Sequence, residues 1–230
     1  MIRLNLTVEG ETEQVFAMQL LAGHLATHGV CLTKPRLTAQ SKKKGHVHRG
    51  GLARYSPFKT DMLRWLKQDR ASDAFFTMMI DLYGLPSDFP GYAAAAICPD
   101  PYARVLNLEE DLQADIRNSR FIPYIQLHEF EALLLSDSAA FACYYPGADR
   151  QIVKLARLVE QFGNPELVDD NESTAPSKRI SREFPDYSSA KATIGPIVAA
   201  KIGLDSIRAK CRHFNDWLTK LEGLGSKQQA

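Results

Sequence analysis

The sequence predicts an α/β protein in which a mainly parallel sheet is flanked by helices and followed by a helical C-terminal part. Two apolar runs, Ile2–Val8 and Ala74–Asp81, have the pattern of strands, and segments with helical spacing lie between the strand-like segments. Strands that alternate with helical segments favour a parallel sheet. Strand patterns fade beyond Leu135. We therefore expect residues 1–137 to form the α/β core and residues 138–230 to form a helical extension packed on it.

The individual elements follow from the spacing of apolar residues. In Ile2–Val8 apolar and polar residues alternate, as in a strand, whereas Ala74–Asp81 is almost continuously apolar, as in a strand covered on both faces. Further strands are expected over residues 31–37 and 121–127. Apolar residues at helical spacing predict helices over residues 11–27, 60–68, 152–162, 189–201 and 214–221.

Carboxylates follow three of these strands. Glu9 comes directly after the first strand, Asp81 ends the second, and Glu129 and Glu131 follow the third. Ligands of α/β sheets bind at the carboxyl ends of the strands, so these acids are expected at one edge. Glu13, one turn into the next helix, is expected to support them. Alternatively, Glu9 only favours the positive N-terminus of that helix.

This set of acids predicts a site for Mg²⁺ or Mn²⁺. Such hard cations prefer oxygen ligands and keep water and substrate phosphate in their shell, and the Cys and His clusters typical of zinc are missing. Glu9 and Asp81 are the principal candidates for catalysis, and Glu129, Glu131 and Glu13 are the further candidate ligands.

Two more segments carry candidates for catalysis. His128 stands beside Glu129 at a strand exit and is a candidate general base, although it could also cap a helix or bond a backbone carbonyl. Residues 175–179 look like a helix start, with Pro and Ser in the first turn. Lys178 and Arg179 would there bind phosphate, and Lys178 would neutralise a transferring phosphoryl group. The alternative is an ordinary exposed helix start.

Charge is distributed unevenly along the chain. The net charge is +1, yet residues 34–70 carry eleven Lys and Arg against two Asp, and residues 100–175 carry fourteen acids against six bases. Within the basic part, residues 41–51 are bounded by glycine and are expected to form a mobile loop. Its cations would contact nucleic acid phosphates without reading sequence, or would only keep the protein soluble. They are Lys42, Lys43, Lys44 and Arg49.

Composition indicates a soluble globular protein. No apolar stretch approaches the ~18 residues of a membrane span, and the N-terminus lacks the pattern of a signal sequence. The four cysteines are widely separated, as expected of free thiols in the cytoplasm.

Several long motifs resemble a known family. Through these motifs the chain is similar to the bacterial family described as domain of unknown function 4276. The motifs are VEGETE at 8–13, MIDLYGLPSDFPG at 79–91, RFIPYIQLHEFEALLLSD at 120–137, NPE at 164–166, APSKRI at 175–180 and CRHFNDWLTKLE at 211–222.

The Glu-Gly-x-Thr-Glu motif at 9–13, with the later Asp81, also resembles the toprim fold of topoisomerases, primases and nucleases of the overcoming-lysogenisation-defect type. This resemblance implies a Mg²⁺-dependent nuclease acting on DNA or RNA, as the effector of an antiviral defence system with an ATPase partner. A homo-oligomer is compatible with it. Toprim enzymes usually carry Asp-x-Asp where this chain has Asp81-Leu82-Tyr83. The alternative is therefore a non-catalytic module that binds nucleic acid or an ATPase partner.

Overall fold

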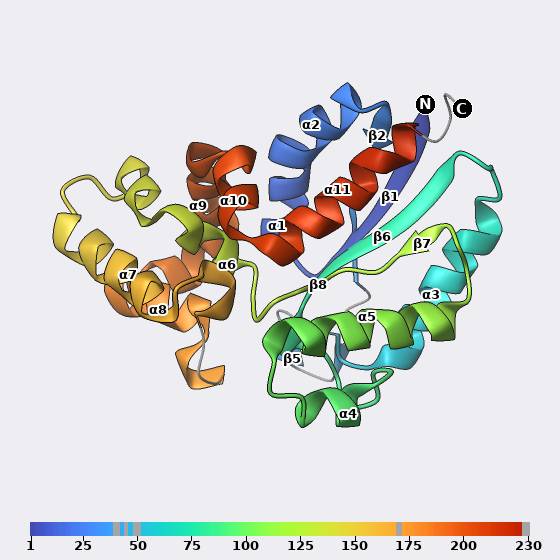
Figure 1. Cartoon of the computed structure of the whole chain (residues 1–230), viewed down its shortest axis with the longest axis horizontal. Helices are drawn as coiled ribbons and strands as arrows, with labels where there is room; N and C mark the ends of the chain where they lie inside the picture. The colour runs from blue at the N-terminus through green and yellow to red at the C-terminus, as the bar shows by residue number, and fades with distance from the viewer. Residues whose placement is uncertain (39–41, 44–45, 48–51, 169–171, 227–230) are drawn as a thin grey trace.

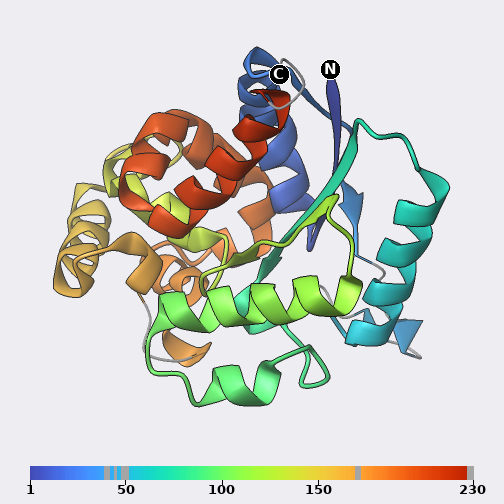
Figure 2. The same cartoon turned by 45° about the vertical axis from the view of Figure 1, so that its right-hand side comes forward.

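A mainly parallel six-stranded sheet lies between two layers of helices (Figure 1). The structure is a computed structural model that describes residues 1–38, 42–43, 46–47, 52–168 and 172–226. Helices α1 (Glu11–Phe16), α2 (Ala22–Thr27) and α11 (Arg212–Ser226) cover one face of the sheet, and α3 (Tyr55–Gln68) and α5 (Pro101–Ile116) cover the other (Figure 2). The expected α/β fold is confirmed.

The two acid-ended strands lie side by side at the centre of the sheet. β1 (Ile2–Val8) pairs in parallel with β6 (Ala74–Asp81), and Val8 lies opposite Met79. On the other side of β1 lie β2 (Val30–Leu32) and β3 (Arg36–Leu37), both parallel to it. The strand expected over 31–37 is thus two short strands that pair with different parts of β1.

The third predicted strand is also divided. β7 (Phe121–Ile122) and β8 (Ile125–Gln126) both pair in parallel with β6. Pro123 lies between them, and because proline has no N–H it cannot donate to a ladder. The chain still leaves β8 at the same edge of the sheet as β1 and β6.

All five predicted helices are present, within longer or continuous helical segments. The segment expected over 11–27 consists of α1, a π-helical turn (Ala17–Leu21) and α2. Short 3₁₀ segments follow β6, α6 and α7 and precede α8. The α-helices are α1 (Glu11–Phe16), α2 (Ala22–Thr27), α3 (Tyr55–Gln68), α4 (Tyr92–Ala96), α5 (Pro101–Ile116), α6 (Glu131–Leu134), α7 (Asp149–Phe162), α8 (Pro176–Glu183), α9 (Tyr187–Ile202), α10 (Leu204–Lys210) and α11 (Arg212–Ser226).

The basic segment contains some regular structure. Lys42–Lys43 forms β4, which pairs antiparallel with β5 at His46–Val47. The segment that the sequence predicts to be a mobile loop therefore contains a short antiparallel pair at these four residues. Lys44, Arg49 and the side chains of Lys42 and Lys43 lie outside the described part of the structure, so their predicted role stays a prediction.

The C-terminal helices share a core with the sheet. Phe214 and Trp217 of α11 are buried in the same cluster as Leu4 and Leu6 of β1. The indole Nε1 of Trp217 also donates to Thr77 Oγ1 on β6 at 2.9 Å. The extension is thus packed on the sheet. Within the described residues, every helix is too short or too polar to cross a membrane.

Candidate metal centre

Glu9 and Asp81 meet at the carboxyl edge of the sheet. Since β1 and β6 are parallel neighbours, their last residues emerge side by side. Glu9 Oε2 accepts a hydrogen bond from the backbone N–H of Asp81 at 3.2 Å. The structure therefore brings together the first two acids that the sequence singled out.

Glu13 joins them from the first turn of α1. Its Oε2 accepts a hydrogen bond from the Gly10 N–H at 2.8 Å, and its side chain is buried. A Cβ at Gly10 would lie 3.1 Å from this oxygen, closer than atoms usually pack. Glycine at position 10 thus allows the carboxylate to fold back over the turn beside Glu9.

The segment after β8 supplies two more carboxylates. Asp81 Oδ1 accepts a hydrogen bond from the Phe130 N–H at 2.9 Å, which fixes the residues on either side of Phe130 near the strand ends. Glu131 Oε1 accepts from the Tyr187 hydroxyl at 3.2 Å and lies 3.5 Å from Lys191 Nζ.

Glu129 is held from the other side. Its Oε2 accepts a hydrogen bond from the Ser177 N–H at 2.9 Å, in the first turn of α8. The positive N-terminus of a helix stabilises a carboxylate in this position. We call Glu9, Glu13, Asp81, Glu129 and Glu131 the acid cluster.

The cluster behaves as one electrostatic unit. Burial, and then the charges of the four other cluster members, raise the pKa of Asp81 well above its usual range. Burial raises the pKa of Glu13 to about 7, with further contributions from the charges of Glu9 and Glu131. The pKa of Glu131 is raised by burial, which outweighs the opposing charge of Lys191. Crowded, partly desolvated carboxylates repel one another, and a cation would relieve that repulsion.

Lys191 and Tyr187 belong to the site, although their sequence signal is weak. The charge of Glu131, followed by that of Asp81, raises the pKa of Lys191 to about 12, although partial desolvation opposes the shift. Both residues lie on α9, far from the strand ends in sequence. Their only sequence signal is their position four residues apart, on one face of that helix.

The donor chemistry of the cluster fits Mg²⁺ or Mn²⁺. All five side chains offer carboxylate oxygens, the ligands that these cations prefer. Among the described residues, His24, His28 and Glu222 form the group of possible ligands whose donor atoms all lie within 4.8 Å of one another. No three carboxylates of the acid cluster meet this criterion in the described chain, so they are more widely spaced. Mg²⁺ keeps several water ligands, which makes a wider spacing usable.

His128 lies next to the cluster but is a weak base. It is buried with a φ of 60°, and its ring centroid lies 5.6 Å from that of Tyr83. Burial, with a smaller contribution from Arg104, lowers its pKa to about 4. The imidazole is therefore neutral at pH 7. Its predicted role as general base stays a prediction.

The helix start at 175–180 is where the sequence placed it, but its contribution differs. α8 begins at Pro176, and the group it directs at the acid cluster is the backbone N–H of Ser177. Lys178 is exposed, and Arg179 Nε donates to the Thr174 carbonyl at 2.9 Å. Phosphate binding by these two side chains stays a prediction.

The histidines of α2 form a separate polar cluster with α10 and α11. His24 Nε2 lies 2.6 Å from Glu222 Oε1, and the Arg208 guanidinium donates to the same carboxylate. The sequence shows the i, i+4 spacing of His24 and His28 but not the acid, which is almost two hundred residues away. With Arg208 on the carboxylate, this cluster links three helices.

Fold and site together define a class: an α/β protein with a parallel sheet and a cluster of carboxylates at the carboxyl edge, suited to a divalent cation. The chain belongs to the family Domain of unknown function (DUF4276), whose model matches residues 8–222. Searches of curated proteins and of solved structures gave no match. The family resemblance is thus confirmed, and the likeness to toprim proteins stays a prediction.

Proposed function

We propose that this protein is a Mg²⁺-dependent nuclease of the toprim type, which hydrolyses phosphodiester bonds of nucleic acid. The observation that carries the proposal is the acid cluster, in which the charges of four carboxylates act on the half-buried Asp81 at the strand ends. Their mutual repulsion at neutral pH favours binding of a divalent cation.

Each acid has a distinct task in this proposal. Glu9 and Asp81, at the two central strand ends, would hold the metal directly. Glu131 would complete the site, in the place of the second Asp of the toprim pair, while Glu13 supports Glu9 from α1. When bound, Mg²⁺ supplies positive charge at the phosphodiester and lowers the pKa of a bound water.

The central test is Glu9→Gln. This substitution keeps size and hydrogen bonding but removes the charge that holds the cation, so cleavage in Mg²⁺ or Mn²⁺ should fall by more than about 10²-fold. Asp81→Asn should behave alike, and Glu131→Gln should be intermediate. Glu11→Gln is the matched control, because Glu11 is exposed on the same helix start. Equal cleavage by wild type and Glu9→Gln, with circular dichroism unchanged, would reject the nuclease.

A second candidate is a non-catalytic module that binds nucleic acid or an ATPase partner. This candidate is favoured because part of the negative charge of the acid cluster is already neutralised without a cation. Lys191 pairs with Glu131, and the N-terminus of α8 binds Glu129. Tyr83 in place of a second Asp points the same way. Calorimetric titration with Mn²⁺ separates the two, because the module should bind nucleic acid without binding metal.

The ATPase partner and the role in antiviral defence are supported only by the toprim resemblance. We propose to test them by co-expression with ATPases encoded beside this chain. Cleavage that appears or increases when the ATPase and ATP are present would support an effector role. Cleavage that is the same without the ATPase would argue for an enzyme that acts alone.

A further inference from the structure

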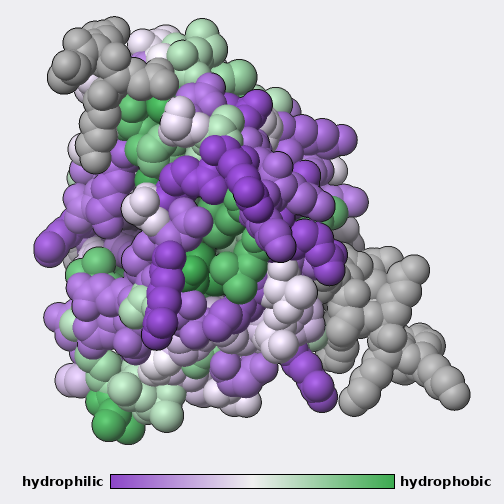
Figure 3. All heavy atoms as spheres, turned by 90° about the vertical axis from the view of Figure 1, so that its right-hand side faces the viewer, coloured by the Kyte–Doolittle hydropathy of each residue, from purple (hydrophilic) through white to green (hydrophobic). Residues whose placement is uncertain are grey.

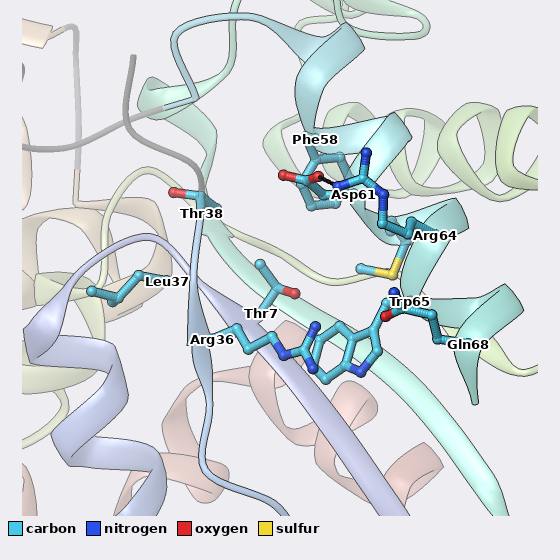
Figure 4. A pocket seen from close by; sticks show the side chains of 10 residues that line it. Thr7, Arg36, Leu37, Thr38, Phe58, Asp61, Arg64, Trp65 and Gln68 are labelled. Atoms are coloured by element: carbon cyan, nitrogen blue, oxygen red, sulfur yellow. Dashed lines mark hydrogen bonds and ion pairs between the residues drawn. The ribbon is translucent and has the colours of Figure 1, made fainter. Parts of the chain in front are cut away.

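A cavity lies between β3 and α3 (Figure 4). Its volume is about 160 Å³. Thr7 of β1 and Arg36 of β3 line one side, and Asp61, Arg64 and Trp65 of α3 line the other. We call it the Arg36 pocket. None of the roles proposed above uses it.

The centre of this pocket is a planar cation on an aromatic ring. The Arg36 guanidinium lies 3.8 Å from the centroid of the Trp65 ring. Trp65 in turn packs edge-on against Phe76 of β6, with centroids 5.3 Å apart and planes at 81°. The indole is therefore fixed by the core, and it holds the guanidinium plane in place. Such a plane is a surface on which nucleobases stack.

Hydrogen-bonding groups surround this surface. Asp61 and Arg64 pair with each other at 3.4 Å at the rim, and Gln68 and Thr7 line the pocket beside Trp65. Together they offer both donors and acceptors to the edge of a flat polar ring. Figure 3 looks onto the α3 side and shows a small hydrophobic area surrounded by hydrophilic side chains.

The size of the pocket selects a single ring. Cavities of roughly 150 Å³ hold a benzene molecule, whereas sites for drug-sized ligands are about 300–1,000 Å³. At about 160 Å³ the Arg36 pocket fits one small base, such as a pyrimidine, and leaves the sugar and phosphate outside. A base paired in a duplex would first have to leave the stack, so an unpaired strand is the better ligand.

The pocket lies close to the acid cluster. Thr7 and Glu9 are two residues apart at the end of β1, a distance of roughly 7 Å along an extended chain. That corresponds to about two stacked nucleotides of one strand, at ~3.4 Å each. The pocket also belongs to the segment 34–70, whose eleven Lys and Arg against two Asp attract phosphates.

We propose that the Arg36 pocket binds one base of a single-stranded nucleic acid, with Arg36 as the stacking surface. The inference extends the proposed function, because a strand held there would lead its next phosphodiesters to the acid cluster. Binding itself needs no metal. It can therefore be tested separately from cleavage.

The test is binding of fluorescein-labelled oligothymidylate in EDTA, followed by anisotropy. Arg36→Ala should weaken binding by about fivefold or more, since loss of a base stack typically has an effect of that size. Arg36→Lys keeps the charge but not the plane and should weaken binding to a similar extent. Arg212→Ala is the matched control, because the Arg212 guanidinium also lies over a ring, 5.5 Å from the centroid of Tyr102, on a different face. It should bind like wild type.

Tryptophan emission gives a second readout. The chain has two tryptophans, of which Trp65 lines the pocket and Trp217 packs in the core on the other face of the sheet. Quenching by oligothymidylate should therefore come from Trp65 and should be lost in Trp65→Phe. Wild-type binding by both Arg36 variants, or equal affinity for a duplex, would overturn the inference. Binding that depends on Arg36 in a protein without cleavage would support the pocket and reject the nuclease. Cleavage by a protein whose binding does not depend on Arg36 would support the nuclease and reject the pocket.

Discussion

At the level of single residues, the acid cluster is a set of ordinary carboxylates whose protonation is changed by their surroundings. Glu11 and Glu13 are two residues apart in sequence, yet Glu11 is exposed while Glu13 is buried against Gly10. Burial raises the pKa of Glu13 to about 7. Its protonation in the folded state therefore changes within the physiological range.

This shift predicts that Glu13 stabilises the metal-free protein less as the pH rises. The usual pKa of the group is 4.5, so between pH 4.5 and about 7 the folded state binds more protons than the unfolded chain. The contribution of Glu13 to the free energy of unfolding must then fall with rising pH, by on the order of 2 kcal/mol between pH 5 and 8. His128 acts in the opposite direction, because its pKa is lowered to about 4 in the folded state. Glu13→Gln should remove most of that decrease, as measured by urea unfolding at the two pH values.

The control for this experiment is Glu11→Gln, which should keep the wild-type pH dependence because its side chain is exposed. Mn²⁺ should offset the loss in wild type at pH 8 more than at pH 5, since it binds the deprotonated acids. The same pH dependence of stability in wild type and in Glu13→Gln would contradict the raised pKa of Glu13.

Among the secondary-structure elements, α9 determines how closely the helical extension approaches the acid cluster. It presents Tyr187 and Lys191 to Glu131, and it contacts α1 through Gly195. A Cβ at Gly195 would lie 3.0 Å from Thr12 Cγ2 and 3.3 Å from Phe130 Cε1. The missing side chain is therefore what allows this approach.

Gly195→Ala should accordingly destabilise the protein. The added methyl group forces α9 away from α1 by a few tenths of an ångström, at a cost of roughly 1–3 kcal/mol typical of overpacking. Thr12→Ser, which removes Cγ2, should recover part of the loss in the double variant, as measured by a double-mutant cycle in urea.

Gly23→Ala is the matched control for that prediction. It also adds a methyl group to a helical glycine, but nothing lies within 4 Å of the new Cβ. This variant should gain stability by about 0.5–1 kcal/mol, because alanine is the better helix former. Equal effects of the two substitutions would show that helix propensity, not the contact with Thr12, determines the change in stability at Gly195.

Among the elements that differ from the sequence-based expectations, α5 and the strand over 121–127 have clear local reasons. The apolar spacing does not predict α5, although Asp100 caps this helix through the Ala103 N–H at 2.9 Å and Pro101 occupies its first turn. These are ordinary start signals. The strand expected over 121–127 is divided at Pro123, because its pairing partner β6 needs donors that proline lacks.

Over the whole molecule, a net charge of +1 conceals two oppositely charged segments. The basic segment 34–70 supplies β3 and α3, which line the Arg36 pocket, and it also contains Lys42–Lys44. The acid cluster draws on the acidic segment through Glu129 and Glu131. A polyanion bound at the basic segment would thus lie near the acid cluster.

This arrangement predicts salt-dependent binding of nucleic acid. Reversing the charge of Lys42, Lys43 and Lys44 to Glu should weaken binding and reduce the slope of log K against log salt by about one unit for each phosphate that is no longer neutralised. Anisotropy titrations over a range of KCl concentrations measure it. Lys201→Glu, an exposed position on α9, is the control and should leave the slope unchanged. An unaltered affinity of the triple variant at low salt would assign the segment to solubility alone.

The α/β class, the two central strands and the acids that end them can be read from the amino-acid sequence. Period-two and continuous apolar patterns are local properties of a strand, and the carboxyl ends of parallel strands share one edge. Glu9 and Asp81 could therefore be placed together without coordinates. The boundary at residue 137 between the α/β core and the helical extension stays a prediction. Residues of α11, on one side of it, share a core with residues of β1, on the other.

The surroundings of those acids, in contrast, follow only from the packing of the folded chain. Lys191, Tyr187 and the N-terminus of α8 reach the acid cluster from segments that are distant in sequence. The separate contact between Glu222 and His24 likewise joins residues that are far apart in the chain. The Arg36–Trp65 stack likewise needs β3 and α3 to pack on the same part of β1. Side-chain charge and pKa depend on these long-range neighbours and on burial, whereas a pattern along the chain reports only which face of its own element a residue occupies.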